Sequence, residues 1–210
     1  MVARETVQRL IQLAGTTYAD EAGIRLADRP MPLFQLLVLC MLAAKPIGAD
    51  VAATAAHEVF ATGARTPKTV LRTPRADIIE AFRRAGYARY DESSASRLVA
   101  LAESTIEKYD GDLRMLGRRC HGDADELRRA LTEFEGVGEV AAGIFMREVQ
   151  DTWTWVRPCL DERAVAGARS LKLPTTPARL GTLAPGRNAR LAAALVRVST
   201  DDQLRAQLLG

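Results

Sequence analysis

Lysine is scarce in this chain of 210 residues, where four lysines accompany 25 arginines. The acidic residues number 26, so the formal net charge is only +3. This balance excludes a polybasic tail but permits a local basic face on a neutral body, and such a face would consist mainly of arginine. A mechanism that needs a lysine amine has only four candidates, which are Lys45, Lys68, Lys108 and Lys172.

Cysteine is also scarce, and the three cysteines lie far apart at Cys40, Cys120 and Cys159. The sequence contains no C-x-x-C pair, and no set of cysteines and histidines has the spacing of a tetrahedral site. We therefore expect no disulfide framework, no structural zinc or other metal centre, and no cysteine-held iron–sulfur cluster.

Long hydrophobic runs are missing as well. The longest apolar run, near residues 33–44, is too short to cross a bilayer. Residues 1–13 alternate charged and apolar side chains and lack the apolar core of a signal peptide. The sequence predicts a cytoplasmic protein without a membrane partner.

Apolar residues recur at helical spacing almost throughout the chain, and no pair of strands is evident. Near residues 33–44 almost every side chain is apolar, which is typical of a helix buried on all sides. Asp50 and Thr73, the latter followed by proline, are predicted to cap two of the next helices. An N-terminal helix is predicted to bury one face made of Val7, Leu10, Ile11 and Ala14. The sequence predicts an all-α fold with nine to eleven helices.

Two glycines separated by one residue lie between two of the predicted helices. The turn is Glu135-Gly136-Val137-Gly138, and its spacing allows a tight hairpin. The helix after it is predicted to bury Val140, Ala141, Ile144 and Phe145. An extended or irregular connector follows at 152–159, and Asp161 then stands where a helix N-cap is expected.

These motifs together resemble the helix-hairpin-helix DNA glycosylase superfamily, of which endonuclease III is the archetype. The resemblance rests on residues 127–145, LRRALTEFEGVGEVAAGIF, and 158–174, PCLDERAVAGARSLKLP. In that family a hairpin of the form LPGVG is followed, one helix later, by an aspartate that opens the next helix. Residues 32–45, PLFQLLVLCMLAAK, are similar to the family's buried helix, and residues 86–90, GYARY, to the turn before its next helix.

The resemblance implies an all-α, two-lobed helical DNA glycosylase fold with a helix-hairpin-helix motif and a central cleft. A barrel-like lobe would span 30–152 and contain the hairpin at 134–145. The second lobe would combine 1–29 with 153–210 and carry Asp161.

The implied function is that of a DNA base-excision repair glycosylase, which hydrolyses the N-glycosidic bond of a damaged base flipped out of duplex DNA. Asp161 would be the catalytic carboxylate, a role compatible with capping a helix. Gly136, Val137 and Gly138 would bind a phosphate through backbone N–H groups. Lys45 would probe the duplex and fill the gap left by the extruded base.

Further contacts are expected around these residues. Arg147 and Arg157 are candidate phosphate partners. The candidates for lining a base pocket are Tyr87, Tyr90, Trp153 and Val140. The resemblance also implies a monovalent cation held by hairpin carbonyls, and no other cofactor. Double-stranded DNA with a damaged base is the expected partner, which would associate the protein with the nucleoid if the source is bacterial. The oligomeric state is left open, with a monomer as the expectation.

Three departures from the family pattern leave alternatives open. Val140 stands where bifunctional members carry the lysine that forms a Schiff base, so a monofunctional enzyme is expected. Glu135 replaces a common proline, and Glu139 occupies a position that is often basic. These residues favour a non-catalytic helix-hairpin-helix DNA-binding protein as one alternative. The other is a bifunctional glycosylase/lyase that uses another lysine, such as Lys45.

Overall fold

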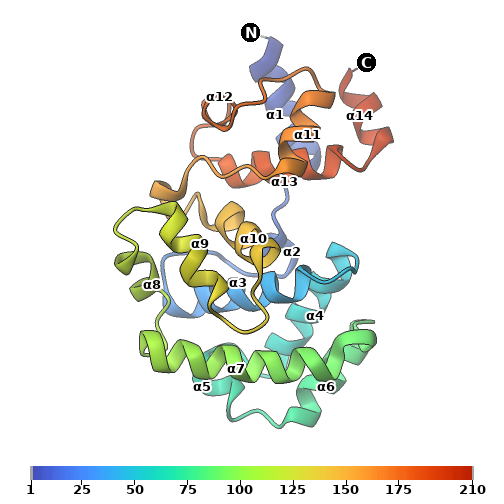
Figure 1. Cartoon of the computed structure of the whole chain (residues 1–210). Coiled ribbons are helices and arrows are strands. Elements are labelled where there is room, and N and C mark those ends of the chain that lie inside the picture. Colours follow the sequence, from blue (N-terminus) through green and yellow to red (C-terminus); the bar gives the residue numbers. More distant parts are fainter. Residues whose placement is uncertain (1, 210) are drawn as a thin grey trace. The chain divides into compact units, whose positions relative to one another are not determined.

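The structure, a computed structural model, describes residues 2–209 and the side chains of 3–208. These residues form helices joined by turns, with no strand among them, which confirms the all-α class (Figure 1). None of the helices within 2–209 combines the length and apolarity needed to cross a membrane. The chain divides into two compact units, a terminal unit (Met1–Thr17 with Met146–Gly210) and a central unit (Tyr18–Phe145). From the sequence we predicted that the units divide after residues 29 and 152.

The central unit is built around α3 (Pro30–Ala43), in which every residue from 32 to 42 is buried. Pro30 suits the first position of this helix because that position needs no N–H donor. α4 (Ala49–Ala61) packs against α3 through a face rich in alanine, and α2 (Tyr18–Glu21) contacts both helices. The prediction that the apolar run forms a helix buried on all sides is confirmed.

The longest described helix, α7 (Asp91–Tyr109), packs against α3, α5 and α6. It ends where Asp110 and Gly111 adopt left-handed backbone angles. The other helices that begin in the central unit are α5 (Pro67–Val70), α6 (Arg75–Arg84), η1 (Ala88–Tyr90), α8 (Arg114–Arg119), α9 (Ala124–Thr132) and α10 (Glu139–Val149).

In the terminal unit, α13 (Asn188–Val198) packs against α1 (Val2–Ala14) and α11 (Glu162–Ser170). The close approach of α11 to α13 depends on Gly167, because a Cβ there would lie 2.0 Å from the Leu195 carbonyl oxygen. The predicted buried face of the N-terminal helix belongs to the core of this unit. The unit also contains η2 (Thr154–Val156), α12 (Pro177–Gly181) and α14 (Asp202–Leu209).

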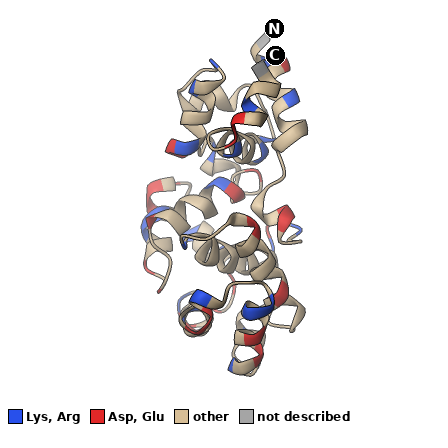
Figure 2. Ribbon diagram, turned by 90° about the vertical axis from the view of Figure 1, so that its right-hand side faces the viewer, with Lys and Arg blue, Asp and Glu red and all other residues tan. Residues whose placement is uncertain are grey.

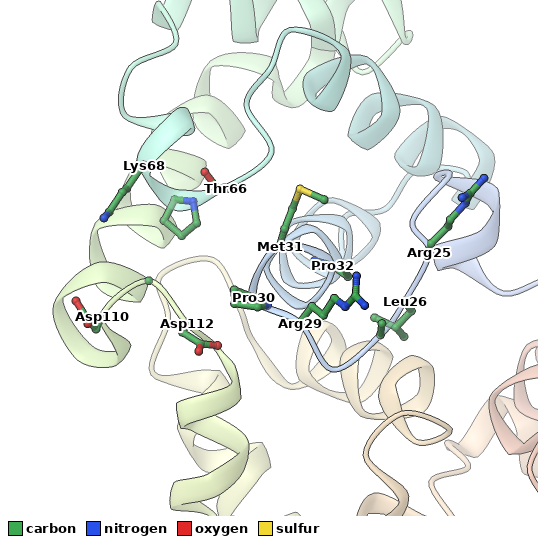
Figure 3. A pocket seen from close by; sticks show the side chains of 13 residues that line it. Arg25, Leu26, Arg29, Pro30, Met31, Pro32, Thr66, Lys68, Asp110 and Asp112 are labelled. Carbon is green, nitrogen blue, oxygen red and sulfur yellow. The ribbon is translucent and has the colours of Figure 1, made fainter.

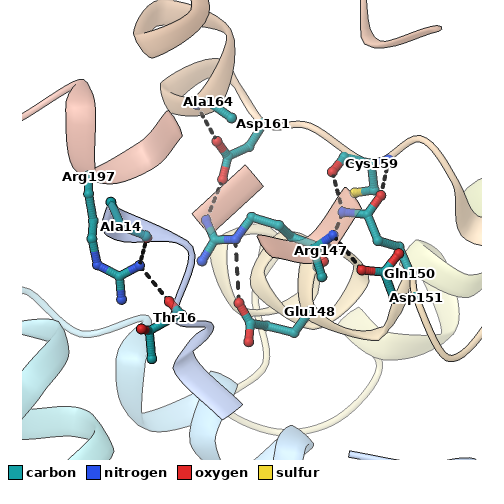
Figure 4. Close-up of polar contacts among 11 residues, drawn as sticks. Ala14, Thr16, Arg147, Glu148, Gln150, Asp151, Cys159, Asp161, Ala164 and Arg197 are labelled. Carbon is teal, nitrogen blue, oxygen red and sulfur yellow. Dashed lines mark hydrogen bonds and ion pairs between the residues drawn. The ribbon is translucent and has the colours of Figure 1, made fainter. Parts of the chain in front are cut away.

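Arg197 ties the last turn of α13 to the chain that leaves α1. Its Nη1 donates hydrogen bonds to the carbonyl oxygens of Ala14, at 2.7 Å, and Thr16 (Figure 4). These bonds satisfy a carbonyl at the end of α1 that has no partner within the helix. The contact joins the two sequence-distant ends of the chain within the terminal unit.

Two predicted helix caps are wrong. α4 begins after Gly48, so Asp50 lies in the first turn of the helix instead of at its N-cap. α6 begins after Pro74, and the Thr73 hydroxyl instead donates to the Thr69 carbonyl oxygen at 2.9 Å. In both cases the side chain bonds or packs locally at a position one or two residues away from the true helix end.

Candidate functional site

The glycine hairpin connects α9 to α10 in the central unit. Val137 is 2% exposed, and its N–H donates to the Phe134 carbonyl at 3.0 Å, which holds the turn against the core. Gly138 is exposed, and its carbonyl accepts the first backbone hydrogen bond of α10, from Ala142. A monovalent cation on hairpin carbonyls stays a prediction.

Gly136 meets two conditions that a residue with a side chain would violate. Its φ of +82° lies in the left-handed region. A Cβ on Gly136 would lie 2.7 Å from Cδ and 3.3 Å from Cγ of Arg97, which belongs to α7. The glycine therefore permits both the turn and the close approach of the Arg97 stem.

Lys45 lies just beyond the C-terminal end of α3 and shares this neighbourhood with Arg97. Burial lowers the pKa of the Lys45 amine, and the nearby positive charge of Arg97 lowers that pKa further. Among the side chains of residues 3–208, neither Lys45 nor Arg97 has an ion-pair partner. We call Lys45 and Arg97 the cationic pair; two like charges held together without a carboxylate favour binding of an anion.

Sequence reasoning selected Lys45 and Gly136 but missed Arg97. Lys and Arg are interspersed with Asp and Glu along the chain (Figure 2), in keeping with the net charge of +3. Nothing in the pattern of 25 arginines distinguishes Arg97 from the others. Its importance arises from the tertiary approach of α7 to the hairpin.

Glu139, the acidic residue that follows the hairpin, has a partner. Oε2 of Glu139 lies 3.5 Å from Nη1 of Arg128. The two residues belong to α10 and α9, the helices that the hairpin connects. Because Glu139 is exposed, this ion pair stabilises the fold little. It does place an arginine beside the first turn of α10.

Val140 was predicted on the buried side of its helix, and this prediction is wrong. Its side chain is 64% exposed, whereas Ala141, Ala142 and Phe145 are fully buried. The apolar stripe of α10 is therefore rotated by about one residue from the predicted one, which leaves Val140 at the surface of the first helical turn.

Asp161 caps α11 as predicted. Its Oδ1 accepts a hydrogen bond from the Ala164 N–H at 2.9 Å, and its Oδ2 accepts one from Nη1 of Arg147 at 2.7 Å (Figure 4). The Asp161 side chain is 33% exposed. The carboxylate is thus held in one orientation by two donors while part of it remains at the surface.

The structure corrects the expectation that Arg147 contacts DNA. Arg147 is 2% exposed, and besides Asp161 it lies beside Glu148, with 3.8 Å between Nε and Oε1. A buried guanidinium must be paired with carboxylates, so this one is not available to a phosphate. Its position makes Arg147 a positioning residue for Asp161.

The connector that leads to Asp161 is held by a buried amide. Gln150 donates from Nε2 to the Cys159 carbonyl at 2.9 Å and accepts from the Cys159 N–H at 2.9 Å. This two-way bond fixes the backbone two residues before Asp161. Gln150 is fully buried, so the bonds form away from water.

Arg157, the second predicted phosphate partner, pairs with Asp151 instead. The Nη2–Oδ1 distance is 2.8 Å, and Arg157 also donates to the Asp151 carbonyl. The Asp151 carboxylate further accepts the backbone N–H groups of Asn188 and Ala189 at the start of α13. Arg157 and Asp151 therefore attach the connector to α13.

Two aromatic candidates for the base pocket are core residues. Tyr87 is fully buried, donates its hydroxyl to the Leu42 carbonyl at 3.1 Å, and has a pKa raised by burial. Trp153 is 5% exposed and stacks on Trp155 with 5.7 Å between ring centroids. Tyr90 is half-buried. Of these three residues, Tyr90 alone is placed to meet a ligand from solvent.

Comparisons with known proteins do not add to this site. No family model matches the chain. Neither a search of curated proteins nor a search of solved structures returned a match. Within the described residues, no three His, Cys, Asp or Glu side chains gather as metal ligands.

Proposed function

We propose that the protein binds duplex DNA through the hairpin and the cationic pair, and that it hydrolyses the N-glycosidic bond of a damaged base. The observation that carries the proposal is the close approach of the Arg97 stem to Gly136, with neither Arg97 nor Lys45 paired with a carboxylate among the described side chains. The resemblance to helix-hairpin-helix glycosylases adds the enzymatic role.

Phosphate binding follows from charge and backbone geometry together. The exposed turn at Gly138 begins an α-helix, where N–H groups and the helix dipole favour an anion. Lys45 and Arg97 add two positive charges to the same unit. Contacts of this kind hold the DNA backbone without reading its sequence, which suits a protein that must search for rare lesions.

Asp161 is the proposed catalytic residue. After the base leaves the stack, the bond between C1′ and the base nitrogen breaks and its electron pair stays with the base. The oxygen of a water molecule bonds to C1′ and loses a proton to the Asp161 carboxylate, which also stabilises the positive charge that develops on the sugar. The base leaves as it takes up a proton. Val140 has no amine, so the product is an intact strand with an abasic site.

One observation favours a second candidate, a lyase that uses Lys45. A lowered pKa increases the unprotonated fraction of an amine, which is the nucleophilic form. The Lys45 amine would attack C1′, displace the base and form a Schiff base that leads to strand cleavage. Borohydride would then trap a covalent adduct with DNA, and the adduct would vanish in Lys45→Ala.

The binding proposal is tested by fluorescence anisotropy with a labelled duplex over a range of salt concentrations. We expect Lys45→Gln and Arg97→Gln each to weaken binding and to reduce the salt slope by about one. Arg72→Gln is the matched control because Arg72 is an exposed arginine of the same unit outside this neighbourhood. Equal salt slopes of DNA binding for all three variants would overturn the proposal.

A further inference from the structure

A cavity of about 840 Å³ lies at the N-terminal end of α3, within the central unit. It is lined by three separate segments, 25–32, 66–68 and 110–112 (Figure 3). Lys45 follows the other end of the same helix, and a helix of 14 residues is about 21 Å long. The proposed DNA-binding residues therefore do not account for this cavity.

The floor of the cavity is apolar. It is formed by Leu26, Pro30, Met31, Pro32 and Pro67. Met31 is 42% exposed although residues 32–42 of the same helix are all buried. Pro30 and Pro32 have no backbone N–H, so the end of α3 offers few donors and polar recognition must come from side chains.

The rim of the cavity is positively charged. Arg25, Arg29 and Lys68 are exposed, and among the described residues none of their side chains forms an ion pair or a hydrogen bond. They belong to two different lining segments, and Figure 3 shows their sticks around the end of α3. Three cations beside an apolar floor favour a ligand that combines carboxylates with an apolar group.

The acidic side chains at the cavity only partly balance the positive charge of this rim. Asp112 is held by Arg114, with Nη2 2.8 Å and Nε 3.0 Å from Oδ2, and this bond lowers the pKa of the Asp112 carboxyl. Asp110 is the remaining acidic side chain of the lining. The cavity thus keeps a net positive charge.

We propose that this cavity is the docking site for an acidic segment of a partner protein that carries one large apolar side chain. The apolar side chain would cover Met31 and the prolines, and neighbouring carboxylates would pair with Arg29 and Lys68. A small molecule is less suited because such ligands are usually enclosed, whereas Arg25, Arg29, Lys68 and Met31 are all exposed here. A nucleobase is less suited because the lining contains no aromatic ring on which to stack.

The test uses a phage-displayed library of random peptides selected on the full chain. We expect enrichment of peptides with several Asp or Glu residues around one Leu, Phe or Trp. A peptide synthesised from the enriched set is then labelled, and its anisotropy is measured with each variant. We expect Met31→Ser to weaken binding about fivefold or more, and Arg29→Gln with Lys68→Gln to do the same while reducing the salt dependence.

Two controls separate this surface from the hairpin and from loss of fold. Lys45→Gln should leave peptide binding unchanged, and the Arg29, Met31 and Lys68 variants should keep the wild-type melting temperature because these side chains are exposed. Enrichment of basic or neutral peptides, no enrichment, or binding that survives both cavity variants would overturn the proposal. Binding of a labelled thymidine oligonucleotide that disappears in the same variants would also overturn the proposal, in favour of a nucleic-acid site.

Discussion

Arg147 donates a hydrogen bond of 2.7 Å to Oδ2 of Asp161, and this bond joins a buried cation to a carboxylate that is one-third exposed. Each side chain depends on the other, because the buried guanidinium needs a negative partner and the carboxylate is oriented by it. Asp161 therefore has a structural role whether or not it acts in catalysis. Experiments on Asp161 must separate the two roles.

We predict that Asp161→Asn lowers the stability of the terminal unit by about 1.5–3 kcal/mol, the range for a hydrogen bond to a charged group. Asparagine keeps an acceptor for the Ala164 N–H but leaves the Arg147 charge without this partner. Hydrogen exchange of the α11 amides measures the loss locally, which avoids assuming that both units unfold together.

Asp123 provides the matched control for that experiment. It caps α9 through the N–H groups of Asp125 and Glu126, at 2.8 and 3.1 Å. Asparagine is as good a cap, so Asp123→Asn should change stability by less than about 0.5 kcal/mol. Equal losses for Asp123→Asn and Asp161→Asn would show that the Arg147 bond contributes nothing beyond the cap.

Gly136→Ala is expected to destabilise the hairpin by about 1–2 kcal/mol from the left-handed backbone alone, with an added cost for displacing Arg97. Gly138→Ala is the control, because nothing lies within 4 Å of a Cβ at Gly138 and its φ is not left-handed. Thermal melts and DNA anisotropy of both variants give the result. A Gly136→Ala protein as stable and as tightly bound to DNA as Gly138→Ala would contradict the geometry.

Arg97→Gln should raise the pKa of Lys45 part of the way toward its ordinary value of 10.5. The shift is partial because burial, the larger cause, remains. The rate of reductive methylation of Lys45, followed by mass spectrometry, should fall in Arg97→Gln near pH 8. An unchanged rate would mean that Arg97 does not act on Lys45.

The same pKa fixes the sign of a pH effect. Lys45 has a lower pKa in the folded protein than in the unfolded chain, so its protonation opposes folding. Its contribution to stability is least favourable below the folded pKa and improves as pH rises toward 10.5. The difference in the free energy of unfolding between wild type and Lys45→Met should therefore shrink as the pH rises through this range.

Cys120 is predicted to resist alkylation in the folded protein. Burial, with smaller effects of Glu126 and Asp123, raises the pKa of its thiol to about 11, and only the thiolate reacts readily. Iodoacetamide at pH 8 should therefore modify Cys120 only after unfolding in urea. Rapid labelling of the native protein would mean that the α8–α9 region opens.

Much of the fold follows from local patterns in the sequence. The continuous apolar run identifies α3, and an Asp-Gly pair of the kind that ends α7 is a local signal typical of a helix C-terminus. The cap at Asp161 could also be predicted locally, because its side chain accepts a hydrogen bond from an N–H only three residues further along the chain. These features need no knowledge of how helices pack.

The candidate sites depend on packing and were predicted less well. Arg97 acquires its role because α7 passes beside Gly136, which no spacing in the chain encodes. Arg147 was expected at the surface because arginine is seldom buried, yet Asp161 pairs with it from 14 residues away. The buried face of α10 was predicted wrongly at Val140 because alanines at 141 and 142 do not define an apolar stripe as strongly as large side chains do.

From the proposed alignment with the glycosylase family, Val140→Lys is predicted to introduce lyase activity. Val140 is 64% exposed on the first turn of α10, so lysine there removes no packing. Borohydride should trap a covalent adduct between this variant and damaged DNA. Glu139→Lys places the same amine one residue away and should give no adduct; an adduct with both or with neither would contradict the proposed alignment.

The central claim is tested most directly by the products formed from duplexes that each carry one modified base, including uracil, oxidised pyrimidines, oxidised purines and alkylated bases. Strands are resolved with and without hot alkali for wild type, Asp161→Asn and Asp123→Asn. The proposal predicts breaks on at least one lesion that appear only after alkali, persist in Asp123→Asn and disappear in Asp161→Asn, which still binds DNA. No product on any lesion, with salt-dependent binding intact, would contradict it and leave a non-catalytic DNA-binding protein.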